Sequence, residues 1–220
     1  MFITKELPTH KTRTADKRRS IEGIVVHCTD GPSNINTLVR YDLGPNHISK
    51  TGCPTVTYHA LVANEQIKET KAKDGSVFDM NTGDVLFGVP EDVICFHSVG
   101  YNTTHLAVAI IYKVDEQWEA GKTKKPQEKY TVKPEAMEGL YDCLIHWCLK
   151  YKIEPKRVKG HREITRGKTC PGMYVNLDDL RFELSKRLQI KLKEAGLYSG
   201  EIDGDFGKRS RAALADYRHS

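Results

Sequence analysis

The sequence lacks any long apolar run. No segment of its 220 residues approaches the ~20 consecutive apolar residues that span a bilayer, so we expect no stable insertion into a membrane. Residues 1–8 also lack the apolar segment of a secretory signal peptide, and residues 9–20 are polar and basic. A secretory signal is therefore excluded for the chain as given, although a processed precursor would look the same.

A large excess of charge of one sign is also missing. The 34 basic residues outnumber the 29 acidic residues and give a formal net charge of +5. This excess allows contact with an anionic polymer but is too small to indicate nucleic acid as a partner. The length suits one domain of ~150 residues with a small appendage, or one larger domain, and we expect a monomer.

The six cysteines form no C-x-x-C pair and follow no regular spacing. Neither a zinc ribbon nor a disulfide framework is therefore indicated, and a reducing compartment fits best. Cys143 and Cys148 lie on the apolar stripe of a predicted helix, where a free cysteine acts as a small core residue.

Apolar and β-branched segments predict strands at residues 23–27, 55–62 and 106–112. The last of these is apolar throughout, which is typical of a strand buried on both faces. Apolar side chains then recur at steps of three and four from Met137 to Tyr151, which predicts an amphipathic helix with Pro134 near its start.

The order of these elements predicts an α/β fold, with a mixed central β-sheet flanked by helices and a small helical module at the C-terminus. A dense helical pattern of leucines follows Asp179. We therefore divide the chain into an N-terminal extension (1–20), a main domain (21–178) and a C-terminal module (179–220). The last ~40 residues are too few for a large core, so they form a mini-domain or dock on the main one.

His27, His161 and Cys170 stand out as possible ligands of one metal ion. Each lies at the end of a predicted strand or in a loop, where side chains can converge on an open cleft. The polar, Gly-bearing loop between His161 and Cys170 allows the chain to bend back and present both. Two imidazoles and one thiolate leave a fourth tetrahedral position open, which is typical of a catalytic zinc site. Taken singly, each of these residues is more often structural.

Four short segments occur in a distinctive order: Ile24-Val25-Val26-His27-Cys28-Thr29, Tyr58-His59-Ala60-Leu61-Val62, His97-Ser98-Val99-Gly100-Tyr101-Asn102, and the stretch from Gly160-His161 to Cys170-Pro171-Gly172. Together they resemble the zinc-dependent N-acetylmuramoyl-L-alanine amidases of the phage lysozyme type, which share a fold with the peptidoglycan-recognition proteins. The resemblance implies that residues 21–178 are a catalytic domain that cleaves the amide bond between N-acetylmuramic acid and L-alanine in peptidoglycan.

The resemblance also implies roles for single residues. His27, His161 and Cys170 would hold one Zn²⁺ ion, and Tyr58 and Lys168 would line the reaction centre. Zinc can lower the pKa of its bound water to about 7 and so supply hydroxide at neutral pH.

Lys168 would stabilise the negative charge that develops on the carbonyl oxygen, and Tyr58 would orient the water or assist proton transfer. A solvated surface lysine and a half-buried sheet tyrosine are the simpler alternatives for these two residues. His97 and Asn102 are predicted to contact substrate.

One departure from the wider family concerns the general base. Many related amidases place a glutamate in the strand that here spans residues 106–111, and this chain has Ala109 at the aligned position. The phage-type branch also lacks the glutamate, so the departure favours that branch and leaves the identity of the proton acceptor open.

The tail carries a second resemblance. A leucine-rich helical segment from Arg187, a turn at Asp203-Gly204 and a second helical segment ending near Leu214 resemble a small peptidoglycan-binding module. Leu197, Phe206 and Leu214 are predicted to form its core. The usual end of the module is missing, so it would bind the wall weakly or pack on the catalytic domain.

Several hypotheses about the function are compatible with the sequence. An endolysin without an export signal would stay in the host cytoplasm until it is released to the cell wall. The alternatives are a non-catalytic peptidoglycan-recognition protein of the same fold and a bacterial cytoplasmic amidase that recycles wall fragments. A regulatory protein partner has no support in the sequence, since the basic run at residues 17–19 is more often a solvated tail.

Overall fold

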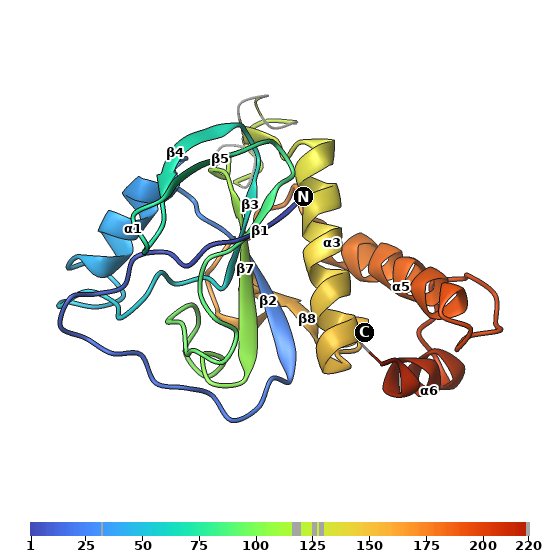
Figure 1. The fold of residues 1–220 in the computed structure, drawn as a ribbon. Coiled ribbons are helices and arrows are strands. Elements are labelled where there is room, and N and C mark those ends of the chain that lie inside the picture. The colour runs from blue at the N-terminus through green and yellow to red at the C-terminus, as the bar shows by residue number, and fades with distance from the viewer. Residues whose placement is uncertain (32, 116–119, 125–126, 128–129, 219–220) are drawn as a thin grey trace.

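The computed structural model describes residues 1–31, 33–115, 120–124, 127 and 130–218. Its centre is a mixed six-stranded sheet in the order β1-β6-β3-β7-β2-β8 (Figure 1). The strands are β1 (Phe2–Thr4), β2 (Gly23–Cys28), β3 (Ala60–Ala63), β6 (Val85–Phe87), β7 (His105–Ile111) and β8 (Val158–Gly160). A separate two-stranded sheet pairs β4 (Ile67–Lys71) with β5 (Val77–Met80). The predicted fold class, a mixed sheet flanked by helices, is confirmed.

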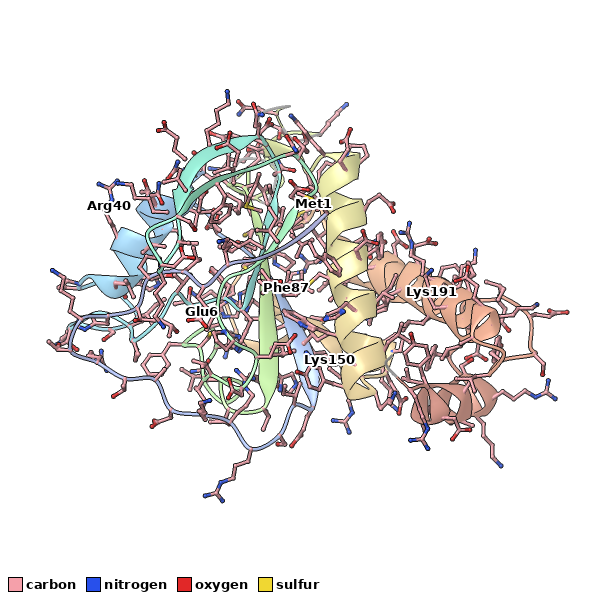
Figure 2. The ribbon with its side chains drawn as sticks, viewed as in Figure 1. Met1, Glu6, Arg40, Phe87, Lys150 and Lys191 are labelled. Carbon is pink, nitrogen blue, oxygen red and sulfur yellow. The ribbon has the colours of Figure 1, made fainter. Side chains whose placement is uncertain are left out.

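Helices cover both faces of the sheet (Figure 1). The helix α1 (Ile35–Leu43) packs on one face, while α3 (Pro134–Tyr151) and α5 (Leu177–Glu194) contribute to the apolar core on the other face. The remaining helical elements are η2 (Pro155–Arg157), α4 (His161–Ile164) and α6 (Lys208–Asp216). Phe87 lies between the sheet and α3 (Figure 2), with its ring 5.8 Å from that of Trp147. The predicted helix ending at Tyr151 is confirmed.

The central strands are buried because their sequences are almost entirely apolar. The predictions for residues 23–27 and 106–112 are confirmed within one residue at each end. The strand predicted at 55–62 begins only at Ala60. The reason lies at Thr57, whose backbone N–H donates to the Asp42 carboxylate at 2.9 Å instead of to a neighbouring strand. The chain therefore reaches Tyr58 outside the sheet ladder.

Residues 1–20, predicted as an extension, contribute to the main fold. The strand β1 pairs in parallel with β6, and Leu7 is buried. Arg18 is also buried, and its guanidinium donates to the carbonyl oxygens of Val93 at 2.7 Å and His105 at 2.6 Å. The prediction of a solvated basic tail is therefore wrong for Arg18, because buried carbonyl groups satisfy its donors.

The C-terminal segment is attached by a continuous helix. The boundary predicted at residues 178–179 falls in the first turn of α5, whose buried leucines share one core with α3. Arg187 of α5 donates to both carboxylate oxygens of Glu138 at 2.6 and 2.8 Å, and it lies 4.2 Å from the ring centre of Tyr141. The tail therefore docks on the main domain through α5.

The small core around α6 differs in one residue from the prediction. Leu214 is buried as expected, but Leu197 is 39% exposed and the neighbouring Tyr198 is buried in its place. Gln189 organises this end of the chain, because its side-chain amide donates to the Asp203 carboxylate at 2.8 Å and to the Asp205 carbonyl at 3.0 Å. Across the described residues, none of the helices has the length and apolar character needed to cross a bilayer.

Candidate active site

The three predicted metal ligands come together at the carboxyl ends of the parallel strands β2 and β8. His27 is the second-last residue of β2, His161 is the first residue of α4, and Cys170 follows α4 in a loop. One ligand atom from each residue lies within 4.8 Å of the other two. The His27 Nδ1 atom is 3.6 Å from Cys170 Sγ, and the two imidazole rings are 4.6 Å apart at their centres.

The loop that carries Cys170 is folded back by Arg162. The backbone N–H of Arg162 donates to the Cys170 carbonyl at 2.7 Å. Its guanidinium donates to the carbonyl oxygens of Gly172 at 2.6 Å and Val175 at 2.8 Å. These bonds hold the loop closed, so His161 and Cys170 face the same point although a polar loop separates them.

Gly160 allows the close approach of β8 to α5 directly before His161. A Cβ atom at this position would lie 2.4 Å from Leu177 Cδ1, well inside van der Waals contact. The glycine therefore lets the chain place His161 at the end of the sheet while α5 packs against the strand that leads to it.

The electrostatic environment favours the ligand forms of Cys170 and His27. Burial alone would raise the pKa of the Cys170 thiol, but hydrogen bonds with Cys28, His161 and His27 outweigh it and hold that pKa well below its usual range. The backbone N–H of Cys28 also donates to Cys170 Sγ at 3.2 Å. Burial lowers the pKa of His27, which favours its neutral form. A thiolate with two imidazoles is a donor set that fits Zn²⁺.

All the predicted site residues line one cavity of about 750 Å³. Its lining includes the ligand cluster together with Tyr58, Lys168, His97 and Asn102. Lys168 is exposed on the loop that leads to Cys170. The Asn102 side chain accepts a hydrogen bond from the Ser98 backbone at 2.7 Å, so it holds the turn at residues 98–102 in shape.

Tyr58 lies beside the ligand cluster. Its ring centre is 5.2 Å from that of His27, and its hydroxyl is 3.5 Å from the Cys28 carbonyl. Burial, with the charges of Cys170 and Asp42, raises the pKa of Tyr58 well above its usual range. The phenol therefore keeps its proton near neutral pH and is suited to donate a hydrogen bond.

The position aligned with the wider family's glutamate lies next to His27. Ala109 of β7 pairs with His27 in the parallel register, so both side chains are on the same face of the sheet. A methyl group is found there in place of a carboxylate. The carboxylates that line the cavity belong to Asp30 and Asp42, and Asp42 accepts hydrogen bonds from Thr57.

Asp42 gives a prediction about stability. Burial raises its pKa from 3.8 to about 6, so the folded chain binds more protons than the unfolded chain between these values. Stability due to Asp42 is therefore present below the unfolded pKa and is lost as the pH rises through about 6. Relative to Asp42→Asn, the wild-type free energy of unfolding should fall by about 3 kcal/mol between pH 3 and pH 7.5. Denaturant unfolding of both proteins across this range measures the difference, and parallel curves would contradict the prediction.

Sequence reasoning missed the part of the cavity wall that is formed by and after the end of α1. It includes Tyr41, near the C-terminal end of α1, and His47 and Ile48 in the segment after this helix. The Tyr41 hydroxyl lies 2.6 Å from His47 Nδ1, and Tyr41 and Ile48 are exposed apolar residues. No motif marks these residues, and their exposure is visible only in the folded chain.

Comparison with known families decides the assignment. The family described as N-acetylmuramoyl-L-alanine amidase matches residues 17–173, which is more than half of the chain. The chain belongs to the N-acetylmuramoyl-L-alanine amidase family. The match ends before α5, so the resemblance of residues 179–220 to a peptidoglycan-binding module stays a prediction.

Solved structures share the amidase fold at low sequence identity. The amidase LysC from Clostridium intestinale URNW is 17% identical with a TM-score of 0.52, covering 84% of this chain and 97% of its own. The endolysin of a Thermus scotoductus bacteriophage is 18% identical with a TM-score of 0.50, covering 77% and 89%. Drosophila peptidoglycan recognition protein SD is 15% identical with a TM-score of 0.55, covering 80% and 90%. Comparison with curated protein sequences gives no match.

Proposed function

We propose that this member of the amidase family is a zinc-dependent peptidoglycan hydrolase that cleaves the amide bond between N-acetylmuramic acid and L-alanine. The observation that carries the proposal is the cluster of His27, His161 and Cys170, whose ligand atoms lie within 4.8 Å of one another in the lining of a cavity of about 750 Å³. Such a cavity is large enough to admit a sugar–peptide junction beside the ligands.

The roles of the chain's own residues follow from their positions. Zinc, when bound, supplies hydroxide at neutral pH. His27 and His161 offer imidazole nitrogens and Cys170 offers a thiolate, a donor set that keeps one position open. Lys168 carries a positive charge into the cavity, where it stabilises negative charge on the carbonyl oxygen of the scissile amide. Tyr58 keeps its phenolic proton and orients the reacting group by donating a hydrogen bond.

The main rival is a recognition protein of the same fold that binds peptidoglycan without cutting it. Drosophila peptidoglycan recognition protein SD shares the fold, so fold alone does not separate the two roles. The complete His-His-Cys cluster favours hydrolysis, because a protein that only binds the wall needs no open metal position. A bacterial amidase that recycles wall fragments differs in its substrate, a small soluble muropeptide in place of the intact wall.

Incubation of the zinc-loaded protein with insoluble walls tests the proposal. We expect one zinc per chain and the release of soluble material, with both lost on chelation and restored by zinc. Binding to walls without any release, by a protein that holds no zinc, would support the recognition role instead.

The C-terminal segment is proposed to bind the wall. The segment from Tyr198 to α6 forms a compact unit at the outer end of α5, organised by Gln189 and built on Leu188, Leu192 and Leu214. Figure 1 shows this unit on the far side of α3 from the centre of the sheet. A unit in this position can hold the enzyme on its substrate without touching the reacting bond.

Deletion of residues 197–220 tests this role. The deletion keeps α5 and its ion pair between Arg187 and Glu138, which a cut at Lys186 would remove. We expect turnover of a soluble muropeptide to be retained, while activity on whole walls falls by about tenfold or more, because the tether that concentrates substrate is lost. Both activities are measured at a temperature where the two proteins are folded. Equal losses on both substrates would mean that the segment supports the catalytic domain instead.

A further inference from the structure

The two ring nitrogens of His27 have different neighbours. The Nδ1 atom faces Cys170 Sγ at 3.6 Å, and the Nε2 atom lies 3.2 Å from His97 Nδ1. A neutral imidazole carries one proton, and the nitrogen that faces the metal position must keep its lone pair free. The proton of His27 therefore belongs on Nε2, where it points at His97.

The neighbour of the second ring nitrogen of His97 determines which nitrogen carries the proton. Its Nε2 atom lies 3.2 Å from the backbone carbonyl oxygen of His105, which can accept a hydrogen bond but cannot donate one. The proton of His97 therefore belongs on Nε2, and its Nδ1 atom offers a lone pair to His27. The two hydrogen bonds run in one direction, from His27 to His97 and from His97 to the sheet backbone.

His97 is held firmly in this position. Its side chain is 7% exposed and its ring meets that of His27 edge-on, with centres 5.3 Å apart. His59 packs on another side at 6.4 Å and is itself fixed, because its Nδ1 atom accepts from the Ala107 backbone at 3.0 Å. Both ring nitrogens of His97 are thus used inside the protein, which leaves none to contact a substrate.

We propose that His97 is a positioning residue, which fixes the tautomer and ring orientation of His27 so that Nδ1 faces the metal. This inference rests on the proposed zinc site and replaces the substrate contact predicted for His97. Partners of metal-bound histidines of this kind typically contribute about 10- to 100-fold to metal affinity. The loss of His97 should therefore weaken zinc binding even in the absence of substrate.

Two substitutions separate the hydrogen bond from the bulk of the side chain. His97→Leu keeps most of the volume but removes the acceptor, which leaves the buried Nε2–H of His27 without a partner. His97→Asn can place its amide oxygen near the position of Nδ1 and restore the acceptor. His105→Leu is the matched control, because it removes a neighbouring imidazole but keeps the backbone carbonyl that His97 uses.

Zinc affinity, measured by competition with a chelator on the folded proteins, is the first readout. We expect His97→Leu to bind zinc about 10- to 100-fold more weakly than the wild type, with His97→Asn and His105→Leu close to the wild type. The absorption spectrum of the Co²⁺-loaded proteins should change in the leucine variant alone. Wild-type affinity in folded His97→Leu, or equal weakening in His97→Asn, would overturn the inference.

Nitrogen NMR of the unmodified zinc-loaded protein gives a second readout that needs no variant. We expect both His27 and His97 to carry their protons on Nε2, and a proton on Nδ1 of His97 would contradict the inference. These results also separate the two proposals. A wild-type protein that binds no zinc would remove the proposed function, whereas zinc binding that is insensitive to His97 would remove only the positioning role.

Discussion

His161→Ala is expected to lose both bound zinc and amidase activity. The substitution leaves only His27 and Cys170, and a zinc site with two protein ligands has a far lower affinity than one with three. Activity on a soluble muropeptide should fall to the background rate, and His27→Ala should behave in the same way. Zinc content per chain and turnover are measured on the same samples.

A matched control distinguishes loss of a ligand from loss of any histidine in the cavity. His47 also lines the cavity but does not belong to the ligand cluster, so His47→Ala should keep one zinc per chain. If either His27→Ala or His161→Ala kept stoichiometric zinc and normal turnover, the assignment of the metal site would be wrong.

Lys168→Ala should lose turnover while it keeps zinc. Lys168 lines the cavity two residues before Cys170, and an ammonium group has no lone pair with which to bind a metal. The substitution removes positive charge near the developing oxyanion, and the loss of one such group typically costs about 10²–10³ in turnover, or ~3–4 kcal/mol. Lys168→Arg should restore little, because a planar guanidinium does not replace a compact point charge.

The control for Lys168 lies on the same loop. Arg166 is exposed and is not among the residues that line the cavity, so Arg166→Ala should keep turnover near that of the wild type. Turnover on a soluble muropeptide is measured together with zinc content. Near-normal turnover of zinc-loaded Lys168→Ala would show that Lys168 is an ordinary surface lysine.

The strongly patterned parts of the fold could be predicted from the sequence. The strand that ends near His27 and the helix that ends at Tyr151 have local patterns that tertiary contacts do not override. The ligand cluster could be predicted because a polar loop joins His161 to Cys170 and a predicted strand ends at His27. The local sequence placed each ligand at a strand end or in a loop, and the resemblance to the amidase family joined His27 to the other two.

The parts that sequence reasoning missed depend on contacts between distant residues. The Asp42 carboxylate accepts a hydrogen bond from the backbone N–H of Thr57, so β3 begins later than predicted. Nothing near Thr57 in the sequence indicates this contact. Arg18 can be buried because the carbonyl oxygens of Val93 and His105 accept hydrogen bonds from its guanidinium. The contact between His97 and His27 joins residues that are 70 positions apart, so its role became visible only in the folded chain.

The chemical identity of the new ends in digested peptidoglycan tests the central claim most directly. Purified peptidoglycan is treated with the zinc-loaded protein, and the soluble products are identified by mass spectrometry. We predict new free amino termini on L-alanine, matched by muramic acid residues without a stem peptide. New reducing sugar ends would contradict the account, because they would mean that the protein cuts the glycan chain.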